Sequence, residues 1–279
     1  MMLNFLVPTD FSENAWNATR YAIQFFEKQP VTFHFLHIDS AGFAEQQPHL
    51  HQPGFSVSGD TGMNSRDSMQ IWINRLQKLP SNPNHCYLNS INKMPFITGV
   101  REYLKTHQIV FMILGTKGAS GLKAATVGSK TGEIITKVKC NALVVPEKAS
   151  FSIPHNIAFT TDYTIDFTEP LIAALKRFAD HHKSSIKILR VAKNKETLST
   201  DHKRNRAYLK SQLKHINHSF HVVENKDLED GLEAFSHKMQ IDVVALIAKN
   251  LNFFQKLLFT PGVAPLTYRA TIPFFIIHE

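Results

Sequence analysis

Short apolar runs alternate with amphipathic stretches along the chain. The run 109–114 is almost continuously apolar and ends at Gly115, which is typical of a strand buried on both faces of a sheet. Between such runs, apolar residues recur three and four positions apart, as in Ala15, Ala18 and Ala22, and this spacing predicts helices with one buried face. Strands that alternate with helices in this way form right-handed βαβ units in parallel sheets.

The same order of elements occurs twice, with a seam at 147–153. The predicted strands of the first copy are 4–7, 31–38, 86–91, 109–114 and 142–145. Those of the second copy are 156–162 with its loop, 186–191, 221–224, 242–248 and 274–277. The length of 279 residues suits two domains of ordinary size. We therefore predict an α/β fold of two tandem doubly wound parallel-sheet domains, 1–148 and 151–279.

Two stretches stand apart from this regular alternation. Residues 40–67 are rich in Gly, Pro, Gln, Ser and His without a sustained period, which predicts a long, mobile insertion after the second strand. In the second copy, Leu209, Leu213 and Ile216 form the apolar stripe of a predicted basic helix.

An acidic residue follows the first strand of each copy. Thr9-Asp10 precedes Phe11, and Thr161-Asp162 precedes another aromatic residue. Open α/β sheets bind ligands at the carboxyl ends of their strands, so Asp10 lies near a candidate site. Capping a turn is nevertheless the commoner role of such an aspartate.

The richest motif follows the run 109–114 and reads Gly115-x2-Gly118-x9-Gly128-Ser129. Glycine lets backbone N–H groups come close to a ligand, and Ser129 lies where it can cap the following helix. With the helix dipole and the nearby lysines, these groups form a candidate phosphate site, although any one glycine alone more often only makes a turn. The motif is neither a Walker A sequence nor Gly-x-Gly-x2-Gly. The lysines concerned are Lys117, Lys123 and Lys130.

This glycine spacing, together with the strands and loops at 4–10 and 31–38, resembles the nucleotide-binding signature of the universal stress protein family. The resemblance implies that the N-terminal domain binds ATP or a related adenine nucleotide, with Asp10 contacting the nucleoside and Ile38 lining the base. Any Mg²⁺ would be held mainly by the phosphates. The residues implied in binding are Pro8, Thr9, Asp10, Ile38, Gly115, Thr116, Lys117, Gly118, Gly128, Ser129, Lys130 and Thr131. ATP, ADP, AMP and a cyclic nucleotide all remain open.

The second copy departs from the signature at the glycine loop. After Ala248 it has Lys, Asn, Phe and Leu in place of the paired glycines, and only Gly262 remains. A Cβ at each former glycine would block close backbone approach. We expect the second domain to keep the fold without a nucleotide site, despite Asp162.

Composition argues against several other classes of protein. The net charge is +8, with 31 Lys+Arg against 23 Asp+Glu, but the basic residues are spread and match no nucleic-acid motif. No apolar run approaches the roughly 20 residues of a membrane span, and the N-terminus has the pattern of a first strand rather than a signal peptide. Two cysteines make no disulfide framework and suggest a reducing compartment. We expect a cytoplasmic protein that binds neither nucleic acid nor membrane.

Metal and catalytic sites find little support in the sequence. His34 and His37 are three apart on a strand and point to opposite faces, while His49 and His51 lack a third ligand. No nucleophile elbow or enforced catalytic triad occurs, and Cys140 precedes an apolar strand as a buried structural thiol would. We assign no metal ligand and no catalytic residue, and expect at most slow ATP hydrolysis.

Two functions are consistent with these patterns. The first is a stress-response regulator that binds an adenine nucleotide. The second is an interaction or scaffold protein that binds none, which the degenerate second copy and the insertion favour. As in dimers of the family, the last strands of the two domains, 142–145 and 274–277, are expected to pair and make an internal pseudo-dimer. A protein partner and a further homodimer are not specified by any residue.

Overall fold

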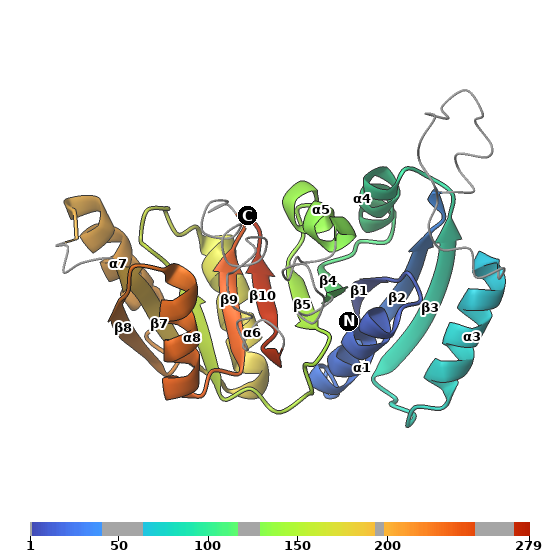
Figure 1. Cartoon of the computed structure of the whole chain (residues 1–279), viewed down its shortest axis with the longest axis horizontal. Coiled ribbons are helices and arrows are strands. Elements are labelled where there is room, and N and C mark those ends of the chain that lie inside the picture. The colour runs from blue at the N-terminus through green and yellow to red at the C-terminus, as the bar shows by residue number, and fades with distance from the viewer. Residues whose placement is uncertain (1, 41–63, 117–128, 193–197, 249–270) are drawn as a thin grey trace. The chain divides into compact units, whose positions relative to one another are not determined.

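The computed structural model describes residues 2–40, 64–116, 129–192, 198–248 and 271–279 (Figure 1). The chain divides into two compact units, Met1–Leu114 and Gly115–Glu279. Both units alternate strands with helices in mostly parallel sheets, which confirms the predicted α/β class. The predicted domain limits, 1–148 and 151–279, follow the sequence repeat and stay a prediction.

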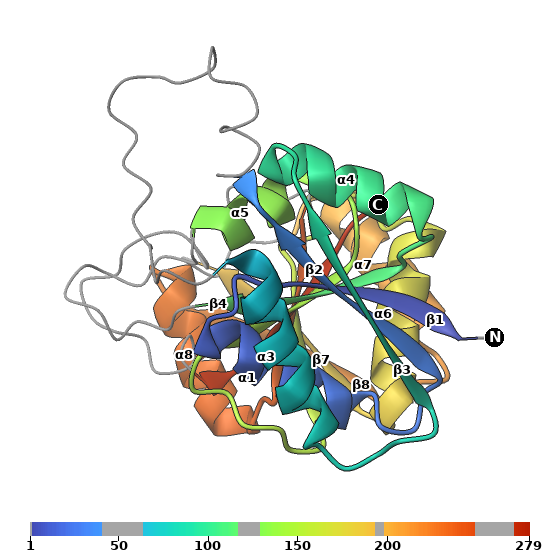
Figure 2. The same cartoon turned by 90° about the vertical axis from the view of Figure 1, so that its right-hand side faces the viewer.

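The first unit is a parallel sheet in the order β3-β2-β1-β4. Phe5 of β1 pairs with Phe33 of β2 on one side and with Phe111 of β4 on the other. Helices α1 and α3 cover one face of this sheet, and α4 covers the other (Figure 2). The elements are β1 (Leu3–Pro8), α1 (Glu13–Phe25), β2 (Val31–Ile38), α3 (Ser65–Gln77), β3 (His85–Asn92), α4 (Phe96–Thr106) and β4 (Phe111–Thr116), of which the last continues into the second unit.

Aromatic side chains form much of the core between this sheet and its helices. The rings of Phe5 and Phe26 meet edge to face with their centroids 4.8 Å apart, and those of Trp16 and Trp72 do so with their centroids 5.2 Å apart. On the opposite face, His34 lies 3.2 Å from the hydroxyl of Tyr103 on α4. The packing of these rings removes apolar surface from water, and this stabilises the first unit.

The second unit is a sheet in the order β5-β10-β9-β6-β7-β8. All its pairs are parallel except β10 with β5, which run antiparallel with Phe274 opposite Val144. This confirms the predicted pairing of the two last strands, while the pseudo-dimer remains an interpretation of it. The elements are α5 (Ser129–Lys137), β5 (Ala142–Pro146), β6 (Asn156–Thr160), α6 (Glu169–His182), β7 (Ser185–Ala192), α7 (Thr200–Gln212), β8 (His218–Glu224), α8 (Leu228–Met239), β9 (Val243–Ile247) and β10 (Phe274–Ile277).

Two predicted boundaries in the second unit differ from the structure. Helix α7 ends at Gln212, so that Leu213 is its cap and Ile216 lies beyond it. Strand β8 begins at His218, three residues before the predicted start, because it pairs with β7 from Ile186 onward. The backbone pairing therefore extends past the part of β8 that the apolar pattern marks.

Other expectations can be checked directly on the described residues. Ser12 caps α1 as predicted, its Oγ accepting from the N–H of Ala15 at 3.3 Å. Cys140 is buried, and burial raises the pKa of its thiol to about 12. None of the described helices is long and apolar enough to cross a membrane. Most of the predicted insertion, 41–63, lies outside the described residues.

Candidate functional site

The turn after β1 is held by side-chain hydrogen bonds to the backbone. The N–H of Thr9 donates to the carbonyl of Leu36 at 2.9 Å, which continues the pairing with β2. Thr9 Oγ1 accepts from the N–H of Phe11 at 2.9 Å, and Asp10 Oδ1 accepts from the N–H of Ser12 at 3.0 Å. Thr9 is buried and Asp10 is exposed, so the turn presents a carboxylate at the carboxyl end of β1.

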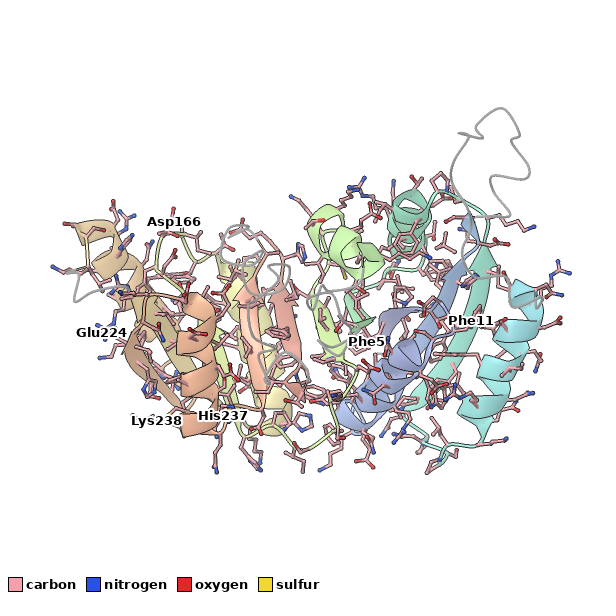
Figure 3. All side chains as sticks on the ribbon, in the orientation of Figure 1. Phe5, Phe11, Asp166, Glu224, His237 and Lys238 are labelled. Atoms are coloured by element: carbon pink, nitrogen blue, oxygen red, sulfur yellow. The ribbon has the colours of Figure 1, made fainter. Side chains whose placement is uncertain are left out.

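Phe11 takes a left-handed backbone conformation in this turn, with φ of 63°. Such a φ costs a residue other than glycine about 1 kcal/mol, so packing must hold the backbone in this conformation. The ring stacks on His37 at 4.5 Å and lies beside α3, 6.1 Å from the ring of Trp72 (Figure 3). His37 in turn lies 2.9 Å from the carbonyl oxygen of Thr9 through Nδ1. Packing and hydrogen bonds together fix the turn before any ligand arrives.

The second unit contains the same turn. Tyr163 has φ of 64°, and its N–H donates to Thr161 Oγ1 at 3.0 Å. Asp162 Oδ1 accepts from the N–H of Thr164 at 3.0 Å, as Asp10 does from Ser12. The N–H of Thr161 donates to the carbonyl of Leu189 at 3.0 Å, the counterpart of the bond between Thr9 and Leu36. The repeat seen in the sequence thus extends to individual hydrogen bonds.

Pro8 and Ile38 end the two neighbouring strands. Pro8 lies opposite Leu36 in the parallel pair of β1 and β2 and is half-buried. Ile38 is only 5% exposed, because its side chain packs under Gly99 of α4. A ligand at this edge would therefore meet only a small part of the Ile38 side chain.

The end of β4 and the start of α5 are joined by one hydrogen bond. Thr131 Oγ1 donates to the carbonyl of Gly115 at 3.0 Å, and Thr116 beside it is buried. Helix α5 begins at Ser129, which the sequence predicts as its cap, and Lys130 is exposed. The N–H groups in the first turn of a helix have no partner within the helix, so they are candidate donors to an anion.

The predicted site residues thus fall into three groups. Pro8, Thr9, Asp10 and Ile38 come together at the carboxyl ends of β1 and β2. Gly115 and Thr116 end β4, a parallel neighbour of β1, while Thr131 contacts Gly115 and Lys130 precedes it in the first turn of α5. Lys117, Gly118, Gly128 and the side chain of Ser129 lie outside the described residues.

Sequence reasoning missed two residues of the turn, Phe11 and His37. The aromatic residue after Thr-Asp in both copies was visible, but its left-handed conformation was not. His37 shows no signal of its own, because its contact with Thr9 depends on the register of β1 and β2. Among the residues that the structure describes, no group of three His, Cys, Asp or Glu side chains is placed to hold a metal ion.

Comparison with solved structures gives the fold over the whole chain. A universal stress protein from Archaeoglobus fulgidus DSM 4304 matches with a TM-score of 0.67 and 13% identity, over 99% of this chain and 98% of that one. A protein of unknown function from Pseudomonas aeruginosa PAO1 matches at 0.57 with 10% identity, over 99% and 92% of the two chains. A putative universal stress protein from P. aeruginosa UCBPP-PA14 matches at 0.56 with 10% identity, over 99% and 93%. No protein-family model matches the sequence, and no curated protein matches it at a significant level.

At this level of identity the likeness concerns the fold. The chain has the tandem universal stress protein fold from end to end, which agrees with the resemblance in its first half. What the chain binds has to be argued from its own residues.

Proposed function

We propose that the chain is a tandem universal stress protein that binds ATP or a related adenine nucleotide through its N-terminal half and acts as a regulator in a stress response. The observation that carries the proposal is the preformed turn at Asp10, at the end of a strand whose parallel neighbour, β4, leads into the glycine motif. Ligands of open α/β sheets bind at this edge.

The phosphates are assigned to the glycine motif. Gly118 and Gly128 have no Cβ to hinder a phosphate, and the first turn of α5 offers N–H donors and the positive end of a helix dipole. The bond from Thr131 to Gly115 fixes the start of α5 against the end of β4. Lys130 adds a positive charge at that helix start. Mg²⁺, when bound with ATP, takes its ligands mainly from the phosphate oxygens.

The nucleoside is assigned to the turn after β1. Within the described part of the chain, the exposed carboxylate of Asp10 accepts one hydrogen bond, from the N–H of Ser12, so it keeps lone pairs for a ribose hydroxyl. The edge of Ile38 is assigned to the base. Because the turn is already ordered, little conformational entropy is lost when a nucleotide binds.

A regulatory role suits the site better than catalysis. The proposed contacts position phosphates but include no general base, so turnover would be slow at most. In this proposal the second domain binds no nucleotide, and the nucleotide state alters how the protein meets a protein partner in the cytoplasm.

One observation favours the alternative, a stress-linked interaction protein without a nucleotide. The turn at Asp162 repeats the backbone N–H bonds of the turn at Asp10, in the copy that lacks the glycine motif. The turn can therefore be a feature of the fold that persists without a ligand. The glycine motif is what distinguishes the two functions.

Substitution in that motif is the direct test. Gly118→Val places a branched side chain where a phosphate needs close backbone approach, and we expect loss of ATP binding by calorimetry with the melting temperature unchanged. Gly262→Val, at the one glycine left in the corresponding loop of the second copy, is the matched control and should keep the wild-type affinity. Equal ATP affinity in the Gly118→Val protein and the wild type would refute the assignment.

A further inference from the structure

Helix α7 carries a stripe of positive side chains along one flank. Its members are exposed and lie three or four positions apart, so they share one side of the helix. The stripe consists of Lys203, Arg206, Lys210 and, just after the helix, Lys214. Arg206 lies over the ring of Phe220, 4.7 Å from its centroid, which places this flank beside strand β8. The stripe thus follows the last strand of the second unit (Figure 1).

Within the described part of the chain, no acidic side chain forms an ion pair with this stripe. The ion pairs of α7 lie on its other flank, where Arg204 contacts Asp201 at 3.3 Å and Asp166 at 3.7 Å. Lysine and arginine side chains stay charged at neutral pH, so like charges lie close together along the stripe. An acidic ligand would relieve their mutual repulsion.

Strand β8 offers an unprotected edge next to the stripe. It is the last strand in the order of the sheet, and among the described strands it pairs with β7 alone. Its residues from His218 to Glu224 are all in register with β7, without a bulge, and none is lysine or proline, the residues that often protect an edge. The outward N–H and C=O groups of β8 can therefore pair with an added strand.

The geometry of such an added strand suits the spacing of the stripe. Phe220 and Val222 lie on the same face of β8, since alternate residues of a strand share a face, and the contact of Phe220 with Arg206 marks it as the α7 face. Val222 is 63% exposed, so it offers apolar contact to a neighbour. Alternate residues of a strand lie about 6.7 Å apart, and residues four apart in a helix lie about 6 Å apart along its axis. Acidic residues at every second position of the added strand therefore match the charges of the stripe.

The first unit has no such stripe. Trp72 of α3 lies beside Phe11, and Asn205 of α7 donates to the carbonyl of Tyr163, so these two helix positions correspond. Counted from them, the positions of the stripe hold uncharged residues in the first copy, namely Gln70, Ile73, Gln77 and Ser81. The fold itself therefore does not require the positive charges.

We propose that β8 and the stripe on α7 form a docking surface for an acidic, extended segment of a partner protein, which adds to the sheet as a strand beside β8. Main-chain hydrogen bonds to β8 hold the segment, and its acidic side chains meet Lys203, Arg206 and Lys210. A nucleic acid would use the charges but not the strand edge, so the combination favours a protein segment. As the partner of the proposed regulator this segment rests on the proposed function, but the docking itself requires no nucleotide.

The probe is a synthetic peptide as long as β8, Thr-Glu-Thr-Glu-Thr-Glu-Thr with blocked ends, titrated into the full chain without ATP. We expect a dissociation constant of the order of 0.1 mM at about 50 mM salt, and weaker binding as the salt concentration rises. Two-dimensional amide NMR should show shifts concentrated at 203–224. The peptide Thr-Glu-Pro-Glu-Pro-Glu-Thr keeps the charges but lacks two N–H groups, so it should bind at least about five-fold more weakly.

Two double variants separate the stripe from the net charge of the protein. Lys203→Gln with Lys210→Gln removes two exposed charges of the stripe and should weaken the binding about five-fold with the melting temperature unchanged. Lys139→Gln with Lys148→Gln is the matched control, because these exposed lysines flank β5, the first strand of the second unit, and it should keep the wild-type affinity.

Absence of shifts at about 2 mM peptide would overturn the proposal, as would equal affinity for the proline peptide or in the Lys203→Gln, Lys210→Gln protein. An oligothymidylate of about ten nucleotides is the rival ligand, and tighter binding of it to the same amides would assign the surface to nucleic acid instead. ATP binding is measured separately by calorimetry, so failure here leaves the nucleotide site untouched, and loss of ATP binding leaves the peptide result standing.

Discussion

Gly99 and Gly231 occupy the same position in the two copies, the fourth residue of α4 and of α8, but only at Gly231 should replacement with alanine destabilise the protein. A Cβ on Gly231 would lie 2.8 Å from Cγ1 and 3.2 Å from Cγ2 of Val191, and 3.3 Å from Cβ of Asn225. A Cβ on Gly99 would lie 2.8 Å from Ile38 Cδ1, with Met94 Cβ at 3.4 Å. The neighbours differ in how easily they can move.

The magnitudes follow from two opposing terms. Replacing a helical glycine with alanine stabilises a helix by about 1 kcal/mol. Overpacking against a stiff β-branched side chain such as Val191 costs about 1–3 kcal/mol, whereas the end of the longer Ile38 side chain can rotate away at small cost. We expect Gly231→Ala to lower the free energy of unfolding by about 1 kcal/mol. Gly99→Ala should be neutral or raise it by up to about 1 kcal/mol.

Urea unfolding of the two variants, followed by circular dichroism, measures this difference. In a Val191→Ala background the two γ-methyl groups are gone, so Gly231→Ala should no longer destabilise the protein. A Gly231→Ala protein at least as stable as Gly99→Ala would contradict this expectation, as would an unchanged cost of Gly231→Ala in the Val191→Ala background.

The remaining predictions concern titration and thiol chemistry. Burial, with Lys139 nearby, lowers the pKa of His278 from 6.5 to about 4. Below pH 6.5 the unfolded chain therefore takes up a proton that the folded chain does not. The free energy of unfolding should fall by up to about 3 kcal/mol between pH 6.5 and 4. Urea midpoints across this pH range should show a smaller loss of stability in His278→Gln than in the wild type. The exposed control His215→Gln should lose as much stability as the wild type. Equal dependence of stability on pH in the wild type and both variants would contradict the assignment. Iodoacetamide at pH 8 should label exposed Cys86 in the native protein and buried Cys140 only after unfolding, and mass spectrometry of two labelled native cysteines would contradict the burial.

The order of helices and strands could be predicted because each element that packs in the core must carry apolar residues at its own spacing. Runs such as 31–38 are buried on both faces, and their apolar character marks them without knowledge of their neighbours. The start of β8 could not be predicted in this way. Its first residues, from His218 on, are only half-buried at the edge of a sheet and contain no apolar run. Backbone pairing with β7, which sequence patterns do not show, sets that boundary.

The candidate site was predictable only in outline. The Thr-Asp pair located the turn at Asp10, because position after a strand suffices for that. The stacking of Phe11 on His37 and the burial of Ile38 under Gly99 depend on strand register and on helix packing, which bring together residues distant in sequence.

We propose that the N-terminal half of this tandem protein binds one adenine nucleotide. Calorimetric titration of the purified full chain with ATP and Mg²⁺, with GTP as the control, tests it most directly. We expect one site per chain that prefers ATP over GTP. Absence of binding heat together with an unchanged melting temperature in ATP would contradict it and favour the interaction protein, and two equivalent sites would contradict the loss of the second site.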